Sequence, residues 1–428
     1  MRAFLAGLGA ALACACSTGA PDMNAVADRY VKLVLAVGQH DPDLVDAYYG
    51  PEEWQAAADR AGQRPIEELR LEAEQLKREA TAIPAPADPL EAFRRDYLRT
   101  QLGAVVARLG MLAGDRLGFD EESRALYDAV APTHPERYFA DTLAQLDALL
   151  PGAAPLSERV NAYRDRHTIP RAAIDAVFQI AIAACRERTR EHLRLPAGEQ
   201  FTVEYVTGKS WSAYNWYQGD YRSLIQVNTD LPIPIDRAID LACHEGYPGH
   251  HVYNVMLEAH LVRARGWREF TVYPLFSPQS LIAEGTANFG IEVAFPGEER
   301  VAFEREHLFP VAGLDPAGAA RYYQVMAVLE ELSYAGNEAA RRYLNGEIDA
   351  TAAAEWLVTY ALMSGPRAEQ RVRFFDQYRS YVINYNLGKD LVRAYVEGRG
   401  GTAARPADRW RVFGELLSSP RLPSGLRE

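Results

Sequence analysis

The sequence gathers side chains that can bind a metal ion in one short segment. Four of its nine histidines lie within 17 positions, and the core of the segment is His244, Glu245, Pro248-Gly249, His250 and His251. In the usual H-E-x-x-H motif two histidines on one helix face bind zinc, and the glutamate between them acts as general base towards a water that the metal activates. The adjacent His244 and Glu245 therefore predict a zinc-dependent hydrolytic site.

The spacing of the histidines departs from that motif. The fourth residue after His244 is Pro248, which offers no ligand atom, and His250 and His251 come two and three residues later than expected. In a straight helix His250 would point about 120° away from His244. Proline interrupts a helix and glycine accepts unusual dihedral angles, so residues 246–249 are predicted to form a bulge that returns a histidine to the metal. We favour His250, which needs two inserted residues, over His251, which needs three.

Glu284 is the predicted third ligand. Ser277 and Pro278 are typical of a helix start, and Glu284 then follows the apolar residues 281–283 in an apolar helix. A glutamate in such a helix is costly unless it is paired, hydrogen-bonded in the core or coordinated to a metal. Two histidines and one glutamate suit Zn²⁺ and leave a fourth position open for water. The same ligands also suit a non-haem iron enzyme, which is an alternative.

The elements that must position these side chains are expected to be mainly helical. Apolar residues recur at helical spacing from residue 22 to 195, with short Pro/Gly breaks, and again from Pro234 to the end. Between them, residues 202–206 and 224–227 are strand-like, and an aromatic loop over 211–221 joins them. The pattern predicts a mainly α fold with one small β-sheet beside the metal-bearing helix. We divide it into a helical half, 21–200, and a metal-bearing catalytic half, 201–428, which form one continuous unit.

Residues 1–20 have the layout of a secretory signal peptide. Arg2 precedes an apolar run from Ala3 to Ala13, and small residues with two cysteines follow. The run is shorter than the ~20 apolar residues that a membrane-spanning helix needs. A cysteine after small residues also resembles a bacterial lipoprotein cleavage site, at Cys14 or Cys16. The mature chain is therefore expected to be exported, either as a periplasmic protein or as a lipoprotein that meets the membrane only through its N-terminal anchor.

Composition restricts the partners of the chain. Its 428 residues are 48% hydrophobic and 24% charged, as in soluble globular proteins, and 46 basic against 58 acidic side chains give a net charge of −12. Nucleic-acid binding depends on basic side chains that neutralise phosphates, so we expect no nucleic-acid partner for this acidic chain. Outside the first 20 residues only Cys185 and Cys243 remain, too few for a disulfide framework or a cysteine-based zinc site.

Three groups of residues carry a family resemblance: the segment from His244 to His251, Glu284-Gly285 on a later helix, and the segment from Tyr385 to Gly388. Together they resemble the bacterial "domain of unknown function 885" family, whose members are often exported or lipid-anchored. That family is similar to the glutamate-ligand zinc metallopeptidases, whose helical members include carboxypeptidase Taq and angiotensin-converting enzyme. The resemblance covers residues 201–391 well and the helical first half loosely. Thr286 stands where the family usually has tryptophan.

The resemblance implies a large helical metallopeptidase-like fold and a role for each motif residue. The implied zinc ligands are His244, one of the two residues His250 and His251, and Glu284. The implied general base is Glu245. In the related helical peptidases a tyrosine from the C-terminal helices stabilises the oxyanion, which implies Tyr385 or, second, Tyr381 in this chain. The substrate is then a peptide or a peptide-like small molecule.

Further residues are assigned to substrate binding. Tyr381 and Arg379 are the predicted contacts, and Arg371 and Arg373 lie close to them in sequence. An arginine here would either clamp a substrate carboxylate through two hydrogen bonds or belong to a solvated basic face. The strand over 224–228 would hold an extended peptide by edge pairing, and the aromatic loop would line the cleft. An exported binding lipoprotein with a relic metal site is the second alternative to a peptidase.

Overall fold

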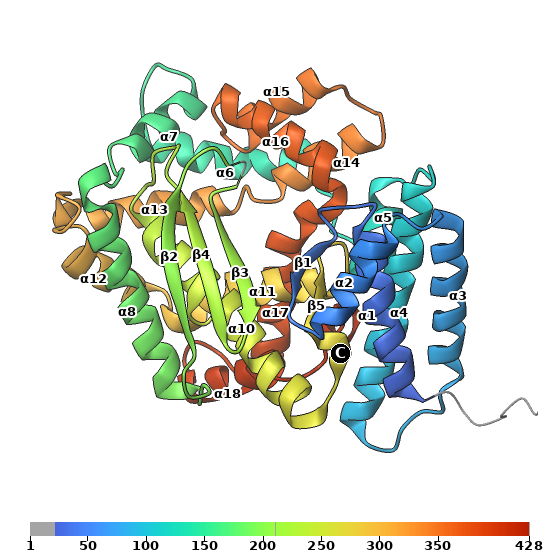
Figure 1. Cartoon of the computed structure of the whole chain (residues 1–428). Helices are drawn as coiled ribbons and strands as arrows, with labels where there is room; N and C mark the ends of the chain where they lie inside the picture. Colours follow the sequence, from blue (N-terminus) through green and yellow to red (C-terminus); the bar gives the residue numbers. More distant parts are fainter. Residues whose placement is uncertain (1–21, 210, 428) are drawn as a thin grey trace, which may run out of the picture.

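The computed structural model describes residues 22–209 and 211–427, and it is mainly helical (Figure 1). The signal peptide and the lipidation at Cys14 or Cys16 that the sequence predicts lie outside these residues. Among the helices it describes, none combines the length and the apolar character that crossing a membrane requires.

The first part of the chain is an array of helices interrupted at prolines and glycines. Its helices are α1 (Met23–Gly38), α2 (Glu52–Ala61), α3 (Ile66–Ala82), α4 (Pro89–Leu112), α5 (Phe119–Tyr127), α6 (Glu136–Leu149), α7 (Leu156–Asp165) and α8 (Ile174–His192). Asp88 caps α4 by accepting hydrogen bonds from the N–H groups of Leu90 and Glu91, and Pro89 occupies the first turn, where no N–H is needed. Helices α1, α3 and α4 pack side by side at the right of Figure 1.

Two small sheets accompany the helices. β1 (Val45–Tyr48) pairs antiparallel with β5 (Val272–Pro274), and Asp46 is the extra residue of a bulge between two paired positions. In the other sheet β4 (Arg222–Asn228) is central, with β2 (Gln200–Val206) parallel on one side and β3 (Ala213–Gly219) antiparallel on the other.

The second part of the chain returns to helices. They are α9 (Asp236–Leu241), α10 (His250–Leu257), α11 (Pro278–Ala294), α12 (Glu298–Phe303), α13 (Ala319–Glu330), α14 (Ala335–Leu344), α15 (Ala350–Tyr360), α16 (Gly365–Tyr378), α17 (Ile383–Gly398) and α18 (Pro406–Leu417). Ser277 precedes α11 and Pro278 opens it, where the sequence predicts a helix start. α10 contacts β3 and β4, and Figure 1 shows the three-stranded sheet in front of α10 and α11.

Helices α11 and α17 pack against each other in the middle of the molecule (Figure 1). α11 contributes to both hydrophobic clusters: Leu281 belongs to the cluster that includes residues of α1, α3 and α4, and Ile282 belongs to the cluster that includes residues of α8 and the three-stranded sheet. A Cβ on Gly388 of α17 would lie 2.7 Å from the carbonyl oxygen of Leu281 and 3.1 Å from Cα of Gly285. Only glycine lets two helix backbones approach this closely. The crossing therefore sets how near α17 comes to Glu284, the neighbour of Gly285.

The predicted fold class is confirmed, with two differences in its sheets. The chain is mainly helical, and its three-stranded sheet lies beside the helix that carries the histidines. The predicted aromatic loop over 211–221 contains strand β3, because its side chains alternate between buried and exposed positions as in a half-buried strand. The two-stranded sheet β1–β5 is not predicted, since each of its strands is too short to show a pattern of its own.

The neighbours of β4 and the pairing of two cysteines differ from what the sequence predicts. The predicted edge pairing of a peptide with residues 224–228 is wrong, because β4 already has a strand on each side. Cys185 of α8 and Cys243 form a disulfide across 58 positions, although two cysteines gave no reason to expect one. Both hydrophobic clusters contain residues from before and after residue 200. The division of the chain at that position stays a prediction.

Replacing Gly388 with Ala is expected to lower the free energy of unfolding by ~1–3 kcal/mol, because the added methyl group overpacks a backbone contact. The matched control is Gly398→Ala at the end of the same helix, where a Cβ meets nothing within 4 Å and stability should be nearly unchanged. Urea unfolding followed by circular dichroism measures both. Equal stability of the two variants would contradict the close crossing of α11 and α17.

Candidate metal centre

An interruption of the helix after α9 determines where His244 and His250 lie relative to each other. α9 continues into a π-helical turn, Ala242–Gly246, and α10 begins at His250. Between them the N–H of Gly249 donates to the carbonyl of Cys243 at 2.9 Å. A Cβ on Gly249 would lie 1.9 Å from the carbonyl oxygen of His244, so only glycine fits without moving the backbone. The structure thus has a bulge at the residues where the sequence predicts one.

His244, His250 and Glu284 meet across this bulge. Nε2 of His250 lies 3.1 Å from Nε2 of His244. Glu284, from α11, places Oε2 3.4 Å from Nε2 of His244 and Oε1 3.9 Å from Nε2 of His250. With bonds of ~2.0–2.1 Å, ligand atoms around a tetrahedral zinc lie about 3.3 Å apart. The three side chains therefore have the spacing of ligands around a single ion.

The charges of the cluster favour a bound cation. Burial, with a contribution from His250, lowers the pKa of His244 well below its ordinary value, and burial lowers the pKa of His250 to about 4. Both imidazoles are therefore neutral at physiological pH, the form that binds metal. Oε2 of Glu284 is buried without a hydrogen-bond partner among the described residues. Such an atom is costly unless a cation meets it, and two nitrogens with one carboxylate oxygen fit zinc.

Glu245 lies beside the cluster. Its carboxylate and the ring nitrogens of His244 and His250 offer ligand atoms that all lie within 4.8 Å of one another. Burial raises the pKa of Glu245 to about 8, and the charge of Glu284 adds to the effect. Burial likewise raises the pKa of Glu284 to about 8. The two oxygens of Glu284 lie 3.4 and 3.9 Å from the Nε2 atoms of His244 and His250, so two buried carboxylates adjoin the two neutral imidazoles.

Tyr381 and Tyr385 reach the cluster from the C-terminal helices. The hydroxyl of Tyr381 donates to Oε1 of Glu284 at 2.9 Å and so orients the carboxylate. The rings of Tyr381 and Tyr385 lie 5.7 Å apart, edge to face. Burial raises the pKa of both hydroxyls above the ordinary value, so both keep their protons at neutral pH. The structure therefore brings Tyr381 into a hydrogen bond with Glu284 and places Tyr385 beside Tyr381.

The predicted substrate arginine, Arg379, contacts the helical half of the chain. Its Nε donates to Oε2 of the buried Glu122 at 2.5 Å, and a terminal nitrogen donates to the carbonyl of Leu117. These contacts do not include the cluster, and a substrate role for Arg379 stays a prediction. Arg371 lies nearer: its guanidinium carbon is 5.6 Å from the centre of the Tyr385 ring, and its Nε is buried without a hydrogen-bond partner in the described part of the chain.

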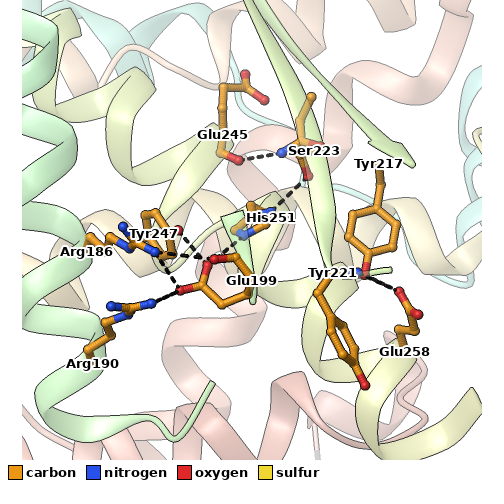
Figure 2. A network of polar contacts seen from close by, with 11 residues as sticks. Arg186, Arg190, Glu199, Tyr217, Tyr221, Ser223, Glu245, Tyr247, His251 and Glu258 are labelled. Carbon is orange, nitrogen blue, oxygen red and sulfur yellow. Dashed lines mark hydrogen bonds and ion pairs between the residues drawn. The ribbon is translucent and has the colours of Figure 1, made fainter. Parts of the chain in front are cut away.

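His251 points away from the cluster. Figure 2 shows its ring between two polar partners: Nδ1 lies 2.9 Å from Oγ of Ser223, and Nε2 lies 3.1 Å from Oε2 of Glu199. Hydrogen bonds from His251, Tyr247 and Arg190 hold the pKa of Glu199 at about 2, although burial alone would raise it. Both ring nitrogens of His251 are thus occupied, which leaves His250 as the histidine that faces His244.

Sequence reasoning gave no role to two residues around the ligands. Asn288 forms a hydrogen bond with His244, and its amide donates to the backbone carbonyl of Glu284 at 2.9 Å. Its position four residues after Glu284 on one helix was a usable signal, because such residues share a helix face. Glu199 had no such signal: it precedes β2, far from the histidines in sequence, and meets His251 only through the fold.

No family model and no curated protein matches the chain, whereas several solved structures do. A candidate lipoprotein from Colwellia psychrerythraea is similar with a TM-score of 0.54 and 13% identity, over 89% of this chain and 79% of that one. An M32 carboxypeptidase from Deinococcus radiodurans R1 has a TM-score of 0.48 and 13% identity, over 94% and 90%. A candidate lipoprotein of unknown function from Shewanella oneidensis has 0.44 and 12%, over 85% and 76%. At 13% identity, the similarity to the Colwellia structure shows that the two chains share a fold, and it gives no information about activity.

Zinc affinity of the metal-free protein is expected to rise with pH up to about 8. Below that pH the buried carboxyls of Glu284 and Glu245, whose pKa values are raised to about 8, hold protons that the cation must displace, whereas the neutral histidines hold none. The gain should be roughly tenfold per pH unit for each displaced proton, and it should flatten above the pKa.

Competition with a chromophoric chelator, from about pH 6 to pH 9, measures this dependence. Glu284→Gln is the control, because it removes one ligand and one displaced proton and should give weaker binding with a shallower slope. A wild-type affinity that stays constant over the lower half of this range would contradict the raised pKa values.

Proposed function

We propose that this chain is a zinc metallopeptidase that cleaves peptide bonds in a peptide or peptide-like small substrate. The observation that carries the proposal is the meeting of His244, His250 and Glu284 at 3.1–3.9 Å, with the buried carboxylate of Glu245 alongside. Structural zinc sites are closed by four protein ligands, whereas catalytic sites have three and an open position. Three ligands beside a carboxylate that can exchange protons favour the catalytic kind.

The proposed chemistry divides between the metal and Glu245. Bound zinc supplies Lewis-acid polarisation of a water and of the scissile carbonyl. The Glu245 carboxylate takes a proton from that water and then returns it to the amide nitrogen of the leaving group. Burial raises the pKa of Glu245, which makes its carboxylate a stronger proton acceptor than an exposed one, and the charge of a bound cation favours the ionised form that accepts the proton.

The two tyrosines are proposed to have separate tasks. Tyr385 offers its hydroxyl proton as a hydrogen bond to the carbonyl oxygen of the substrate, where negative charge develops during attack. Tyr381 already donates to Oε1 of Glu284, so its hydroxyl holds a ligand in place. Burial keeps both hydroxyls protonated, which both tasks require.

Strand β3 and Arg371 are the proposed substrate contacts. β3 is an edge strand of its sheet, and the amide of its Asn215 donates to the carbonyl of Glu245 at 2.7 Å, so the strand borders the base. An edge strand can pair with an extended peptide. The half-exposed Trp216 packs against Tyr214 on the same strand, with ring centres 4.5 Å apart, and offers an apolar surface beside it. Arg371 is proposed, in addition to the predicted Arg379, as the partner of a substrate carboxylate.

We further propose that the mature chain is exported, either as a periplasmic protein or as a lipoprotein anchored through Cys14 or Cys16. The similar fold of the Colwellia candidate lipoprotein supports this location, and it suits an exported binding protein with a relic metal site equally well. Two observations favour a working zinc peptidase over the alternatives. Oε2 of Glu284 has no hydrogen-bond partner within residues 22–209 and 211–427, which is costly unless a cation lies there, and an iron enzyme would have no use for Glu245.

Replacing Glu245 with Gln is expected to slow peptide hydrolysis by about 10²–10⁴-fold, because an amide cannot accept the proton, while bound zinc is unchanged. Cleavage of a broad peptide library, followed by mass spectrometry with and without a chelator, gives the rate, and elemental analysis gives the metal. Glu284→Gln should instead lose the zinc. Unchanged cleavage by Glu245→Gln would remove its role as base. A wild-type chain with no chelator-sensitive cleavage would favour the binding protein, and iron in place of zinc would favour the oxygenase.

Tyr385→Phe is expected to lower kcat by about 10²–10³-fold with little change in KM, because the lost hydrogen bond forms only as charge develops on the substrate. Tyr381→Phe should instead weaken zinc binding, since it removes the donor that orients Glu284. Steady-state kinetics and chelator competition on both variants separate these effects. If Tyr381→Phe shows the larger loss in kcat at full zinc occupancy, the two assignments are reversed.

A further inference from the structure

His250 faces the metal residues only while the bulge between the π-helical turn and α10 keeps its shape, and one buried carboxylate contacts the chain on both sides of that bulge (Figure 2). We propose that Glu199 and His251 are positioning residues: the Glu199 carboxylate binds Tyr247 and His251 together and thereby directs His250 towards the zinc. The proposal rests on the zinc site proposed above. It assigns different tasks to two adjacent histidines, one as ligand and the other as anchor.

A single oxygen atom joins the two ends of the bulge. The hydroxyl of Tyr247 donates to Oε2 of Glu199 at 2.6 Å, and Nε2 of His251 lies 3.1 Å from the same oxygen. Tyr247 directly precedes the segment 248–250, and His251 directly follows it. Since both ends of so short a segment are bound to one atom, its path is restricted, and the direction of the His250 side chain is restricted with it.

The carboxylate that joins them is itself fixed. Its other oxygen, Oε1, accepts hydrogen bonds from Arg190 at 2.5 Å and from Arg186 at 3.2 Å, both on α8. The side chain of Glu199 is fully buried, whereas the two arginines are partly exposed. A buried carboxylate surrounded by donors makes charge-assisted hydrogen bonds, which are stronger than neutral ones. A neutral amide in its place cannot accept from all of these donors, because one of its two polar atoms is itself a donor.

The ring of His251 is held at both nitrogens. A carboxylate can only accept, so Nε2 of His251 carries the proton that points to Glu199. Nδ1 is then an acceptor and receives the hydroxyl proton of Ser223, which lies 2.9 Å away on β4. Both residues are buried. Because neither nitrogen is free, the ring cannot turn to the metal, and this explains why His250 and not His251 lies beside His244.

The sheet also stabilises the other side of the bulge. The irregular turn frees the carbonyl of Glu245 from regular helical pairing, and the side-chain amide of Asn215 on β3 donates to it at 2.7 Å. β3 thus contacts the π-helical turn directly, through the carbonyl of Glu245. β4 contacts His251 just after the bulge, and α8 acts through Glu199 (Figure 2). The small sheet acts as a support for an interrupted helix, and Glu199 is the residue that joins most of these contacts.

The test compares zinc affinity in Glu199→Gln and Tyr247→Phe with that of the wild-type chain, by competition with a chromophoric chelator. Both variants should bind zinc about ten- to a hundredfold more weakly, as is usual when a residue that orients a metal ligand is lost. The matched control is Tyr217→Phe. Tyr217 is also a buried tyrosine that donates to a buried carboxylate, Glu258, at 2.5 Å, but it lies away from the bulge (Figure 2). Its affinity for zinc should stay within about twofold of wild type.

Cobalt absorption provides a second readout that a purely structural role would not change. Co²⁺ in place of zinc should give the strong visible bands of a tetrahedral site in the wild-type chain and in Tyr217→Phe. In Glu199→Gln and Tyr247→Phe the bands should weaken or shift, because one imidazole is displaced. Thermal unfolding of the metal-free proteins shows whether each variant is folded.

The outcomes separate this proposal from the proposed function. Wild-type affinity and an unchanged cobalt spectrum in both Glu199→Gln and Tyr247→Phe would overturn the positioning role and leave the peptidase proposal intact. A wild-type chain that binds no zinc would overturn both. If Glu199→Gln does not fold, Tyr247→Phe decides alone, because it removes a single hydroxyl group.

Discussion

The buried carboxylate of Glu284 imposes the main electrostatic requirement on the residues around it. It lies on α11, which contributes to both hydrophobic clusters, and one of its oxygens has no hydrogen-bond partner among the described residues. The two imidazoles that it faces are neutral, since burial lowers the pKa values of both. Negative charge in such surroundings is stable only beside a cation. The charges of the cluster therefore suit a bound cation, as the proposed zinc site requires.

Close backbone approach brings the remaining groups to that carboxylate. Gly285 and Gly388 let α17 lie against α11, and this contact carries Tyr381 to within hydrogen-bond distance of Glu284. Gly249 lets the chain fold back over His244, and this brings His250 to the same place. Each glycine sits next to, or a few residues from, a side chain of the site. Small residues here act on the chemistry by setting distances between backbones.

An interrupted helix is a weak way to hold a ligand, because the turn that breaks it loses regular hydrogen bonds. In this chain the lost pairing is replaced from the side by the three-stranded sheet and α8. Asn215 satisfies a freed carbonyl, and Glu199 binds the two residues that flank the turn. The disulfide between Cys185 and Cys243 joins α8 to the residue before His244. Both histidine-bearing segments are thus fixed by groups that are distant in sequence.

The helical class, a bulge near residues 246–249 and the candidates His244, Glu245, Glu284 and one of two adjacent histidines could be predicted from sequence, because periodicity, Pro-Gly chemistry and residue type act locally. The roles of these four residues stay proposals. The direction of His251, the central place of β4, the strand within the aromatic loop and the pairing of Arg379 with Glu122 depend on how the elements pack. His251 has two partners that are distant in sequence: Ser223 lies 28 positions away and Glu199 lies 52 positions away. Such contacts leave no periodic trace in the chain, because they arise only when separate elements pack together.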